Sequence, residues 1–199
     1  MNLWLVRHAR PDIAPGICYG RTDMNADADL TLECARSLAG VLPFNMPVTV
    51  SPLVRCRQLA AGLANLRPDL TFTVDARLQE MDFGTWEGQP WDRIARVEMD
   101  AWTSNFADYA VGHGESVSAF MRRVALVYDE LPDPPPRTAP TNDALWITHA
   151  GVIRAASLIA AGRRQLQRAD EWPGDAPGFG QWRVLKLREE VHNCVISAT

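Results

Sequence analysis

The sequence predicts an α/β fold, a three-layer sandwich with a mainly parallel central sheet. Short apolar runs, which are typical of buried strands, alternate along the chain with segments of helical periodicity, and this alternation favours parallel strands joined by helices. The chain has 199 residues, of which 47% are hydrophobic and 22% are charged, so it can bury one full core. We therefore expect a single domain over residues 1–199.

The first half of the chain contains two expected strands and two expected helices. Residues 3–6 and 48–51 are apolar runs of the length of buried strands. A helix fits residues 32–42. A second helix, over about residues 51–66, is expected to begin with Ser51 as its N-cap, followed by a proline in the first helical position.

The middle of the chain is less regular. Residues 71–74 alternate as a strand does, and residues 78–86 follow as an extended or looped segment. The pattern is weakly helical over residues 91–109 and strongly helical over residues 116–131. Ser116 stands before the apolar run of that last helix and is expected to be its N-cap.

Prolines dominate residues 132–140 and stop regular structure there. Because only about 60 residues follow, a surface loop within one domain is favoured over a linker. A buried strand is expected over residues 144–148, a helix over residues 151–161, and two closing strands over residues 182–187 and 191–197.

Composition and charge exclude several classes of protein. The net charge of −4 and the pI of 5.6 do not favour the basic face of a nucleic-acid binder. The most apolar stretch, residues 144–161, is interrupted by His149 and Arg154, so no membrane span is expected. The amino-terminal segment lacks the pattern of a secretory signal, and a cytoplasmic location is expected. Four cysteines lie far apart without a C-x-x-C pair, which indicates reduced thiols rather than zinc ligands.

Five residues from four separate segments suggest a reaction centre. Arg7 and His8 end the first expected strand, and Arg55 lies early in the helix after the second. Glu80 stands in an acidic loop, and His149 ends a later strand. Ligands of open parallel sheets bind at the carboxyl ends of the strands, where His8 and His149 are both expected.

These residue types suit metal-free phosphoryl transfer through nitrogen. A neutral imidazole can attack phosphorus, while guanidinium groups and a second, protonated imidazole neutralise the charge that builds on the phosphoryl oxygens. A carboxylic acid must then protonate the departing oxygen and later accept a proton from water. Glu80 is the candidate for that acid.

Five blocks of sequence resemble one known family. LVRHARP resembles the R-H-G signature of the histidine phosphatase, or phosphoglycerate-mutase-like, superfamily. Four later blocks resemble that superfamily in the same order and span most of the chain: SPLVRCRQLA at 51–60, LQEMDFGTWEG at 78–88, GHGES at 112–116 and WITHAGVIR at 146–154. The resemblance implies a phosphoglycerate-mutase-like fold and an enzyme that needs neither a metal nor another cofactor.

The resemblance also implies a role for each of the five residues. His8 would be the phosphorylated nucleophile, and Arg7 and Arg55 would bind the phosphate. Glu80 would be the general acid and base, and His149 would bind the transferring group.

The sequence departs from the family pattern at several positions. Ala9 and Arg10 replace the usual Gly-Glu or Gly-Gln after the first histidine. Ala14 stands where an asparagine often binds the phosphate. Ala150 replaces the glycine that usually follows the second histidine, but its backbone N–H survives the change, so we expect it to contact the anion.

Within the superfamily, the chain most resembles α-ribazole phosphatases, on the basis of its short length, ICYGRTD at 17–23 and FGTWEG at 83–88. That resemblance implies removal of the 5′-phosphate of α-ribazole phosphate in the assembly of the cobalamin nucleotide loop. Tyr19, Gly20 and Arg21 would then lie in a loop over the phosphate and bind substrate, although a Tyr-Gly pair is also ordinary turn chemistry.

Other functions remain open from the sequence. The chain could act on other small phosphoesters or sugar phosphates, transfer phosphate as a mutase does, or bind phosphoesters with little catalysis. A mutase is disfavoured because the short chain leaves little material for a lid that excludes water. Asp27, Asp29 and Thr31 fit the D-x-D-x-T motif of Mg²⁺-dependent haloacid-dehalogenase-type phosphatases, but no apolar strand precedes them. We expect a small-molecule phosphomonoester as partner, and a monomer or homodimer.

Overall fold

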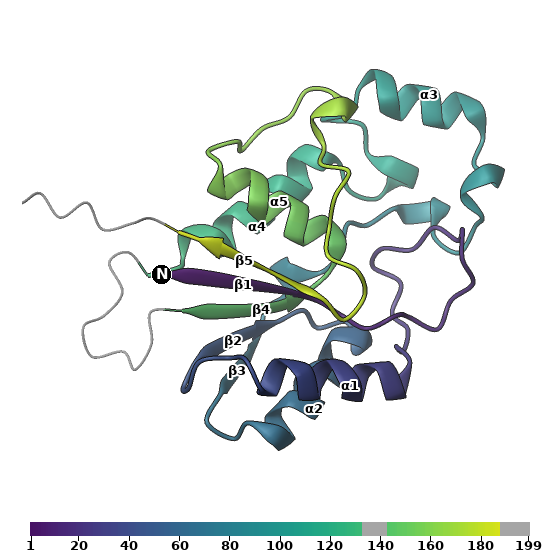
Figure 1. The fold of residues 1–199 in the computed structure, drawn as a ribbon. Coiled ribbons are helices and arrows are strands. Elements are labelled where there is room, and N and C mark those ends of the chain that lie inside the picture. The colour runs from purple at the N-terminus through teal and green to yellow at the C-terminus, as the bar shows by residue number, and fades with distance from the viewer. Residues whose placement is uncertain (133–142, 188–199) are drawn as a thin grey trace, which may run out of the picture.

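The computed structural model describes residues 1–132 and 143–187. Its strands form one sheet in the order β3-β2-β4-β1-β5. All neighbours in the sheet are parallel except β5, which runs antiparallel to β1 (Figure 1). The strands are β1 (Asn2–Arg7), β2 (Pro47–Val50), β3 (Thr71–Val74), β4 (Ala144–Thr148) and β5 (Trp182–Lys186). The mainly parallel sheet predicted from the sequence is therefore confirmed.

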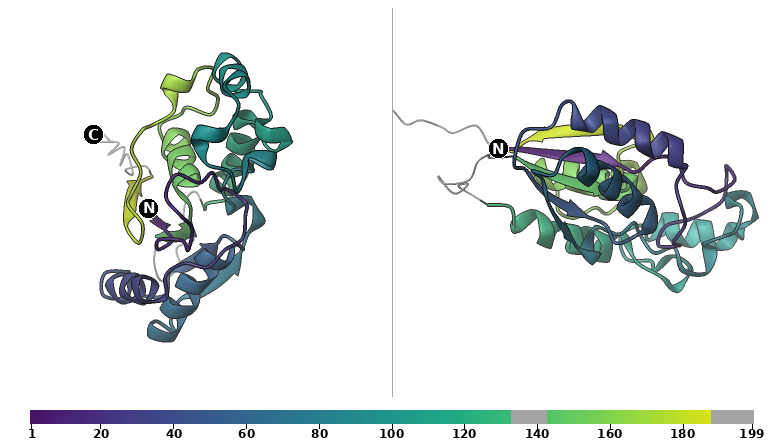
Figure 2. Two further views of the ribbon diagram at one scale, coloured as in Figure 1. Left: turned by 90° about the vertical axis from the view of Figure 1, so that its right-hand side faces the viewer. Right: turned by 90° about the horizontal axis from the view of Figure 1, so that it is seen from below.

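Helices cover both faces of this sheet. α1 (Ala28–Ala39) and α2 (Val54–Leu66) lie together on one face, and α4 (Val117–Asp129) and α5 (Ala150–Ala160) lie on the other (Figures 1 and 2). α3 (Arg96–Ser104) lies on the same side as α4 and α5, farther from the sheet. The three layers predicted from the sequence are present.

The core is divided by the sheet into two clusters. Strand side chains alternate between the faces, so Leu5 and Trp146 belong to the cluster under α4 and α5. Val6, Leu145 and Ile147 belong to the cluster under α1 and α2. Every residue of β4 is buried, which is expected for a central parallel strand covered on both faces.

The expected elements are all present in the described residues, with shifted ends. The helix expected over residues 32–42 is α1, which starts earlier because Asp27 accepts a hydrogen bond from the backbone N–H of Leu30. The weakly helical segment 91–109 forms a short turn and α3. The expected strand over residues 191–197 and almost all of the proline-rich segment lie outside the described residues.

The start of α2 differs from the prediction. Ser51 is not its N-cap, because the helix begins at Val54 after two further residues. The backbone N–H of Ser51 instead donates to Ile147, which extends the β2–β4 pairing. Asp23, from a distant loop, accepts from the N–H of Val54 at 2.7 Å and so supplies the cap that local sequence could not reveal.

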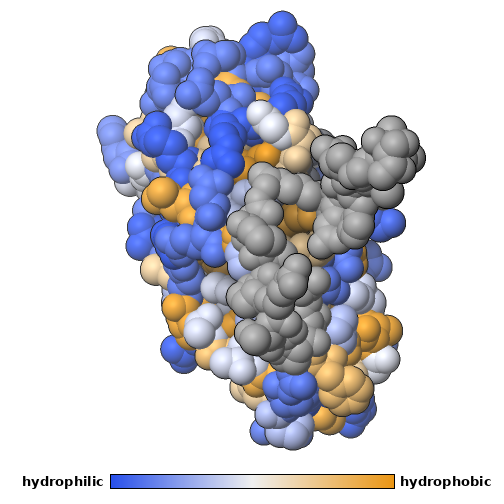
Figure 3. Space-filling model, turned by 90° about the vertical axis from the view of Figure 1, so that its left-hand side faces the viewer, coloured by the Kyte–Doolittle hydropathy of each residue, from blue (hydrophilic) through white to orange (hydrophobic). Residues whose placement is uncertain are grey.

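The end of the sheet where β1 begins is an ordinary mixed surface. Its described part carries mainly hydrophilic residues in the upper region and a mixture of hydrophilic and hydrophobic residues below (Figure 3). Among residues 1–132 and 143–187, no helix has both the length and the apolar character needed to cross a membrane. The candidate reaction-centre residues, among them His8 and His149, lie at the opposite end of the sheet, where the parallel strands β1 and β4 end.

Candidate active site

The ends of β1 and β4 bring the two predicted site histidines together. The strands are parallel neighbours, with Arg7 opposite Thr148, and the N–H of His8 donates to the carbonyl of Thr148 at 3.1 Å. The next residue of each strand is therefore a histidine. The imidazole centroids of His8 and His149 lie 5.1 Å apart, although the residues are far apart in the sequence.

His8 is held as the tautomer whose Nε2 carries a lone pair. Its Nδ1 lies 2.7 Å from the carbonyl oxygen of Ala9, which can only accept, so Nδ1 carries the proton. Burial lowers the pKa of His8 from 6.5 to about 3, and the charge of Arg55 acts in the same direction, while the bond to Ala9 opposes them. At neutral pH the ring is an uncharged imidazole whose Nε2 can act as a nucleophile.

His149 is also buried and neutral. Burial is the main cause that holds its pKa well below the ordinary value, with the neighbouring His8 and Arg55 adding to the effect. Its Nε2 lies 2.8 Å from the hydroxyl oxygen of Ser51, and its Nδ1 has no hydrogen-bond partner among the described residues. The protonated second imidazole expected from the sequence is therefore not the state of the ligand-free protein. An incoming phosphate dianion would raise this pKa again.

Arg55 lies in the first turn of α2 and is fully buried. Its Nε donates to Nε2 of His8 at 3.3 Å, and its two terminal nitrogens donate to the carbonyl oxygens of Thr22 and Gly20 at 2.8 and 2.7 Å. In the part of the chain that the structure describes, no carboxylate pairs with it. A buried guanidinium with only neutral partners is a ready site for an anion.

Arg7 provides a second guanidinium beside His8. It donates to the carbonyl of Pro177 at 3.1 Å and lies 3.9 Å from the centre of the Phe179 ring. Burial lowers its pKa, whereas the charge of Glu80 and a hydrogen bond with Tyr19 oppose that effect. Arg7 is thus held next to the histidines by neighbours from three separate segments.

Phe179 is a site neighbour that sequence reasoning missed. Its ring lies 5.7 Å from that of His8 and is partly exposed. The Gly- and Pro-rich loop that carries it precedes β5, and β5 pairs antiparallel with β1, so the loop returns to the end of β1. The only signal in the sequence was this clustering of glycine and proline around one aromatic residue.

Glu80 points at the start of α5. One carboxylate oxygen accepts from the N–H of Gly151 at 2.9 Å, and the other accepts from the N–H of Met81 at 3.1 Å. A Cβ on Gly151 would lie 2.2 Å from the Glu80 carboxylate, so a larger residue there would displace this carboxylate from its present position. Ala150 is the first residue of α5, and its N–H is among those that a helix leaves free for an anion.

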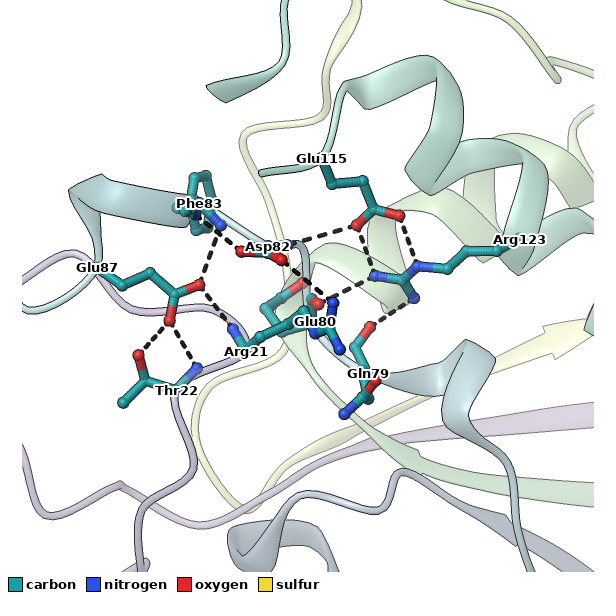
Figure 4. Close-up of polar contacts among 10 residues, drawn as sticks. Arg21, Thr22, Gln79, Glu80, Asp82, Phe83, Glu87, Glu115 and Arg123 are labelled. Atoms are coloured by element: carbon teal, nitrogen blue, oxygen red, sulfur yellow. Dashed lines mark hydrogen bonds and ion pairs between the residues drawn. The ribbon is translucent and has the colours of Figure 1, made fainter. Parts of the chain in front are cut away.

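The three residues predicted to bind substrate have different surroundings. Tyr19 is half-buried, and its ring centre lies 5.7 Å from the guanidinium of Arg55. Gly20 allows a close approach, because a Cβ there would lie 1.8 Å from the carbonyl oxygen of Met81. Arg21 is half-exposed and pairs with Asp82 at 3.2 Å (Figure 4).

The loop of Tyr19–Arg21 is fastened to the segment after Glu80 by Glu87, which sequence reasoning also missed. Its carboxylate accepts from the N–H groups of Arg21, Thr22 and Phe83 at 2.9, 2.6 and 3.0 Å (Figure 4). These bonds lower the pKa of Glu87 even though burial, the largest single effect, acts to raise it. The two segments that resemble α-ribazole phosphatases, residues 17–23 and 83–88, are thus joined to each other by hydrogen bonds.

The structure shows the surroundings of the residues that depart from the family pattern. Ala9 is buried and contributes its carbonyl to His8, a role that needs no particular side chain. Arg10 and Ala14 are exposed. Asp27, the first residue of the D-x-D-x-T match, caps α1, and Thr31 donates to its carbonyl oxygen, so this match has a structural explanation.

The thiols take no part in disulfides among the described residues. Cys18, Cys34 and Cys56 are free and buried, and burial raises the pKa of each. Cys56 lies 3.5 Å from Nε2 of His149, on the same side as Ser51. Cys194 lies outside the described residues.

β1 and β4 each end next to a buried histidine, a buried arginine donates to the first of them, and a carboxylate accepts from the start of the helix that follows the second. Phosphoryl transfer through a histidine needs groups of these kinds. The chain matches the model of the histidine phosphatase superfamily, branch 1, over residues 3–189. It belongs to that superfamily and is a histidine-phosphatase-type phosphatase.

Individual relatives agree with this assignment. A curated protein of Hydrogenobacter thermophilus, whose name refers to phosphoserine phosphatase, is 27% identical over 81% of this chain and 79% of its own length. The mycobacterial glucosyl-3-phosphoglycerate phosphatase has a similar structure, with a TM-score of 0.74 and 25% identity over 92% of this chain and 88% of that one. TTHB049 of Thermus thermophilus matches with a TM-score of 0.68 and 29% identity over 93% of both chains.

The lowered histidine pKa values predict a loss of stability in acid. Between the pKa of about 3 in the folded protein and the ordinary value of 6.5, unfolded His8 binds a proton that folded His8 does not. The free energy of unfolding should therefore fall as the pH drops below 6.5, by up to about 1.4 kcal/mol per pH unit for each such histidine. Urea unfolding from about pH 7 to about pH 5 measures this slope.

The matched variants are His8→Asn and His113→Asn. His113 is exposed and has a positive φ of 61°, which asparagine tolerates, so its replacement should leave the slope unchanged. His8→Asn should flatten the slope and stabilise the protein most at the acidic end. Equal slopes in both variants and the wild type would show that His8 is not held neutral.

Proposed function

We propose that the chain hydrolyses small-molecule phosphomonoesters without a metal, through a phosphohistidine on His8. Nε2 of His8 attacks phosphorus, the bond from phosphorus to the ester oxygen breaks, and Glu80 gives its proton to that oxygen. The oxygen of water then attacks phosphorus and gives a proton to the Glu80 carboxylate, the phosphorus–nitrogen bond breaks with its electron pair returning to Nε2 of His8, and inorganic phosphate is released. Both steps balance without any further reactant.

One observation carries this proposal. Nε2 of the neutral His8 faces the Nε of buried Arg55, which no carboxylate neutralises among the described residues. A phosphoryl group that accepted a hydrogen bond from Arg55 would lie against the nucleophilic nitrogen. Arg7, Nδ1 of His149 and the N–H of Ala150 would provide the remaining contacts to its oxygens.

The substrate proposed first is α-ribazole 5′-phosphate. The support for it is that the loop of Tyr19–Arg21 and the segment with Glu87 resemble those of α-ribazole phosphatases. The relatives suggest two others, phosphoserine and glucosyl-3-phosphoglycerate, because these are the compounds in their names. All three are monoesters of an alcohol, so they demand the same protonation of a poor leaving group by Glu80.

A substrate panel tests the proposal. Specificity constants are measured with excess chelator for these three monoesters, for common mononucleotides and for phosphoglycerates. We expect turnover to survive the chelator, phosphate to be released into water, and α-ribazole 5′-phosphate to have the highest kcat/KM. A preference for phosphoserine or glucosyl-3-phosphoglycerate would replace the substrate but keep the chemistry.

Two results would contradict the chemistry itself. Loss of activity with chelator, restored by Mg²⁺, would indicate a metal-dependent route. Transfer of the phosphoryl group to an added phosphoglycerate in preference to water would indicate a mutase.

A further inference from the structure

We propose that Arg123 and Glu115 form a clamp that positions Glu80 for proton transfer. This inference rests on the proposed function, because it concerns the residue that acts there as acid and base. Neither side of the clamp would touch the substrate. Both are positioning residues that act through the backbone on which Glu80 is carried.

Arg123, on α4, uses every N–H group of its guanidinium to bind the loop that carries Glu80 and the carboxylate of Glu115. Its Nη1 donates to the carbonyl oxygens of Arg77 and Gln79, at 2.7 Å each, and its Nη2 donates to that of Glu80 at 3.0 Å. The remaining N–H groups donate to the carboxylate of Glu115 at 2.8 and 2.9 Å (Figure 4). All five donors of the guanidinium are therefore used.

Glu115 holds the other end of the loop. Its N–H donates to the carbonyl oxygen of Asp82 at 2.8 Å, and its carboxylate lies 3.4 Å from the N–H of Asp82. The backbone on both sides of Glu80 is thus fastened to one ion pair. The side chains of Arg123 and Glu115 are only 19% and 15% exposed, so solvent screens the pair weakly.

A pocket lies along one side of the loop, and an aromatic ring lies on the other. A cavity of about 420 Å³ borders Gln79 and Asp82, with the clamp residues in its wall. On the side that faces this space, the hydrogen bonds of Arg123 hold the backbone of the loop. On the other face, the ring of Phe120 lies under the guanidinium at 4.6 Å and close to Gly151.

The clamp matters because proton transfer depends on the position of the Glu80 carboxyl group relative to the leaving oxygen. A general acid must stay within hydrogen-bond reach of the leaving oxygen, and a displacement of about 1 Å can lower a rate 10²-fold. A partly buried ion pair is by itself weak support for stability. The clamp should therefore act on proton transfer more than on folding.

The test is the dependence of kcat/KM on the leaving group, measured with aryl phosphates from 4-nitrophenyl to phenyl phosphate. This constant reports the transfer to His8 and not the later attack of water. Glu80→Gln should lower it for phenyl phosphate by about 10²-fold and for 4-nitrophenyl phosphate by much less, since nitrophenolate leaves without a proton. Arg123→Met should give the same pattern, with a loss of about 10-fold or more for phenyl phosphate.

Matched variants separate positioning from stability. Arg164 forms a similar two-bond pair with Asp129 of α4, about half-exposed and away from the loop, and Arg164→Met should leave the leaving-group dependence unchanged. Arg123→Lys keeps one charge and fewer donors, so it should recover part of the loss and provide a second folded variant. Melting temperatures are measured for all of them.

The outcomes distinguish this inference from the proposed function. Phosphoenzyme is trapped from 4-nitrophenyl phosphate with an alkaline quench; its absence from the wild type would contradict the function and, with it, the clamp. Its presence, with an equal loss for both substrates in Arg123→Met and Arg123→Lys, would contradict the clamp alone. The expected result is that kcat/KM of the Arg123 variants depends more steeply on the leaving group than that of the wild type, while phosphoenzyme is still formed.

Discussion

Replacement of His8 by asparagine should abolish hydrolysis, with a loss of kcat of about 10⁴-fold or more. Asparagine keeps a polar side chain beside Ala9 and Arg55 but has no nitrogen lone pair that can attack phosphorus. The second imidazole is held differently from His8, because Nε2 of His149 lies against the hydroxyl of Ser51. The measurement combines steady-state hydrolysis with trapping of the phosphoenzyme, which should vanish.

His113→Asn is the control for this experiment. It removes an exposed imidazole that is not among the residues of the site, at a positive φ that asparagine tolerates, and should leave both hydrolysis and phosphoenzyme formation unchanged. If His8→Asn still formed a covalent phosphoenzyme, the nucleophile would have to be another residue. His149 would then be the first to replace.

Replacement of Arg55 by lysine should lower kcat/KM by about 10² to 10³-fold, although the charge is retained. Lysine presents a point charge with three donors, and it cannot reproduce the planar fork that joins His8 to the carbonyls of Gly20 and Thr22. The phosphoryl group would lose a charge-assisted contact, and the loop above it would lose an anchor. Inorganic phosphate should also become a weaker competitive inhibitor.

Arg57→Lys is the matched change. Arg57 lies on the exposed side of the same helix, so its replacement should leave both kcat/KM and inhibition by phosphate unchanged. Melting temperatures then show whether the Arg55 variant remains folded. A folded Arg55→Lys protein with wild-type kcat/KM would remove Arg55 from the phosphate site.

The strands could be predicted from the local pattern of apolar residues, but the distances between residues at their ends could not. Their apolar runs mark them because burial on both faces requires apolar side chains at nearly every position, as in β4. The histidines after β1 and β4 were expected near each other because parallel strands finish at one edge. Their 5.1 Å separation required the pairing of Arg7 with Thr148, which is a tertiary fact.

Positions that depend on distant partners could not be predicted in the same way. Ser51 has the ideal sequence for an N-cap, yet its hydroxyl lies against His149 and the cap comes from Asp23. The neutral state of His149 is another example, because burial in the assembled fold decides its pKa. Phe179 reaches His8 only because β5 pairs antiparallel with β1.

Periodicity and motif spacing are local properties of the chain, and they were enough to predict the class of fold, the order of its elements and the residue types of the reaction centre. Which atoms face one another depended on packing between distant segments: Nε2 of His8 toward Arg55, Glu80 toward Gly151, and Arg123 toward the backbone of the loop. Hydrogen bonds act over about 3 Å, and that scale is set when strands and helices pack together.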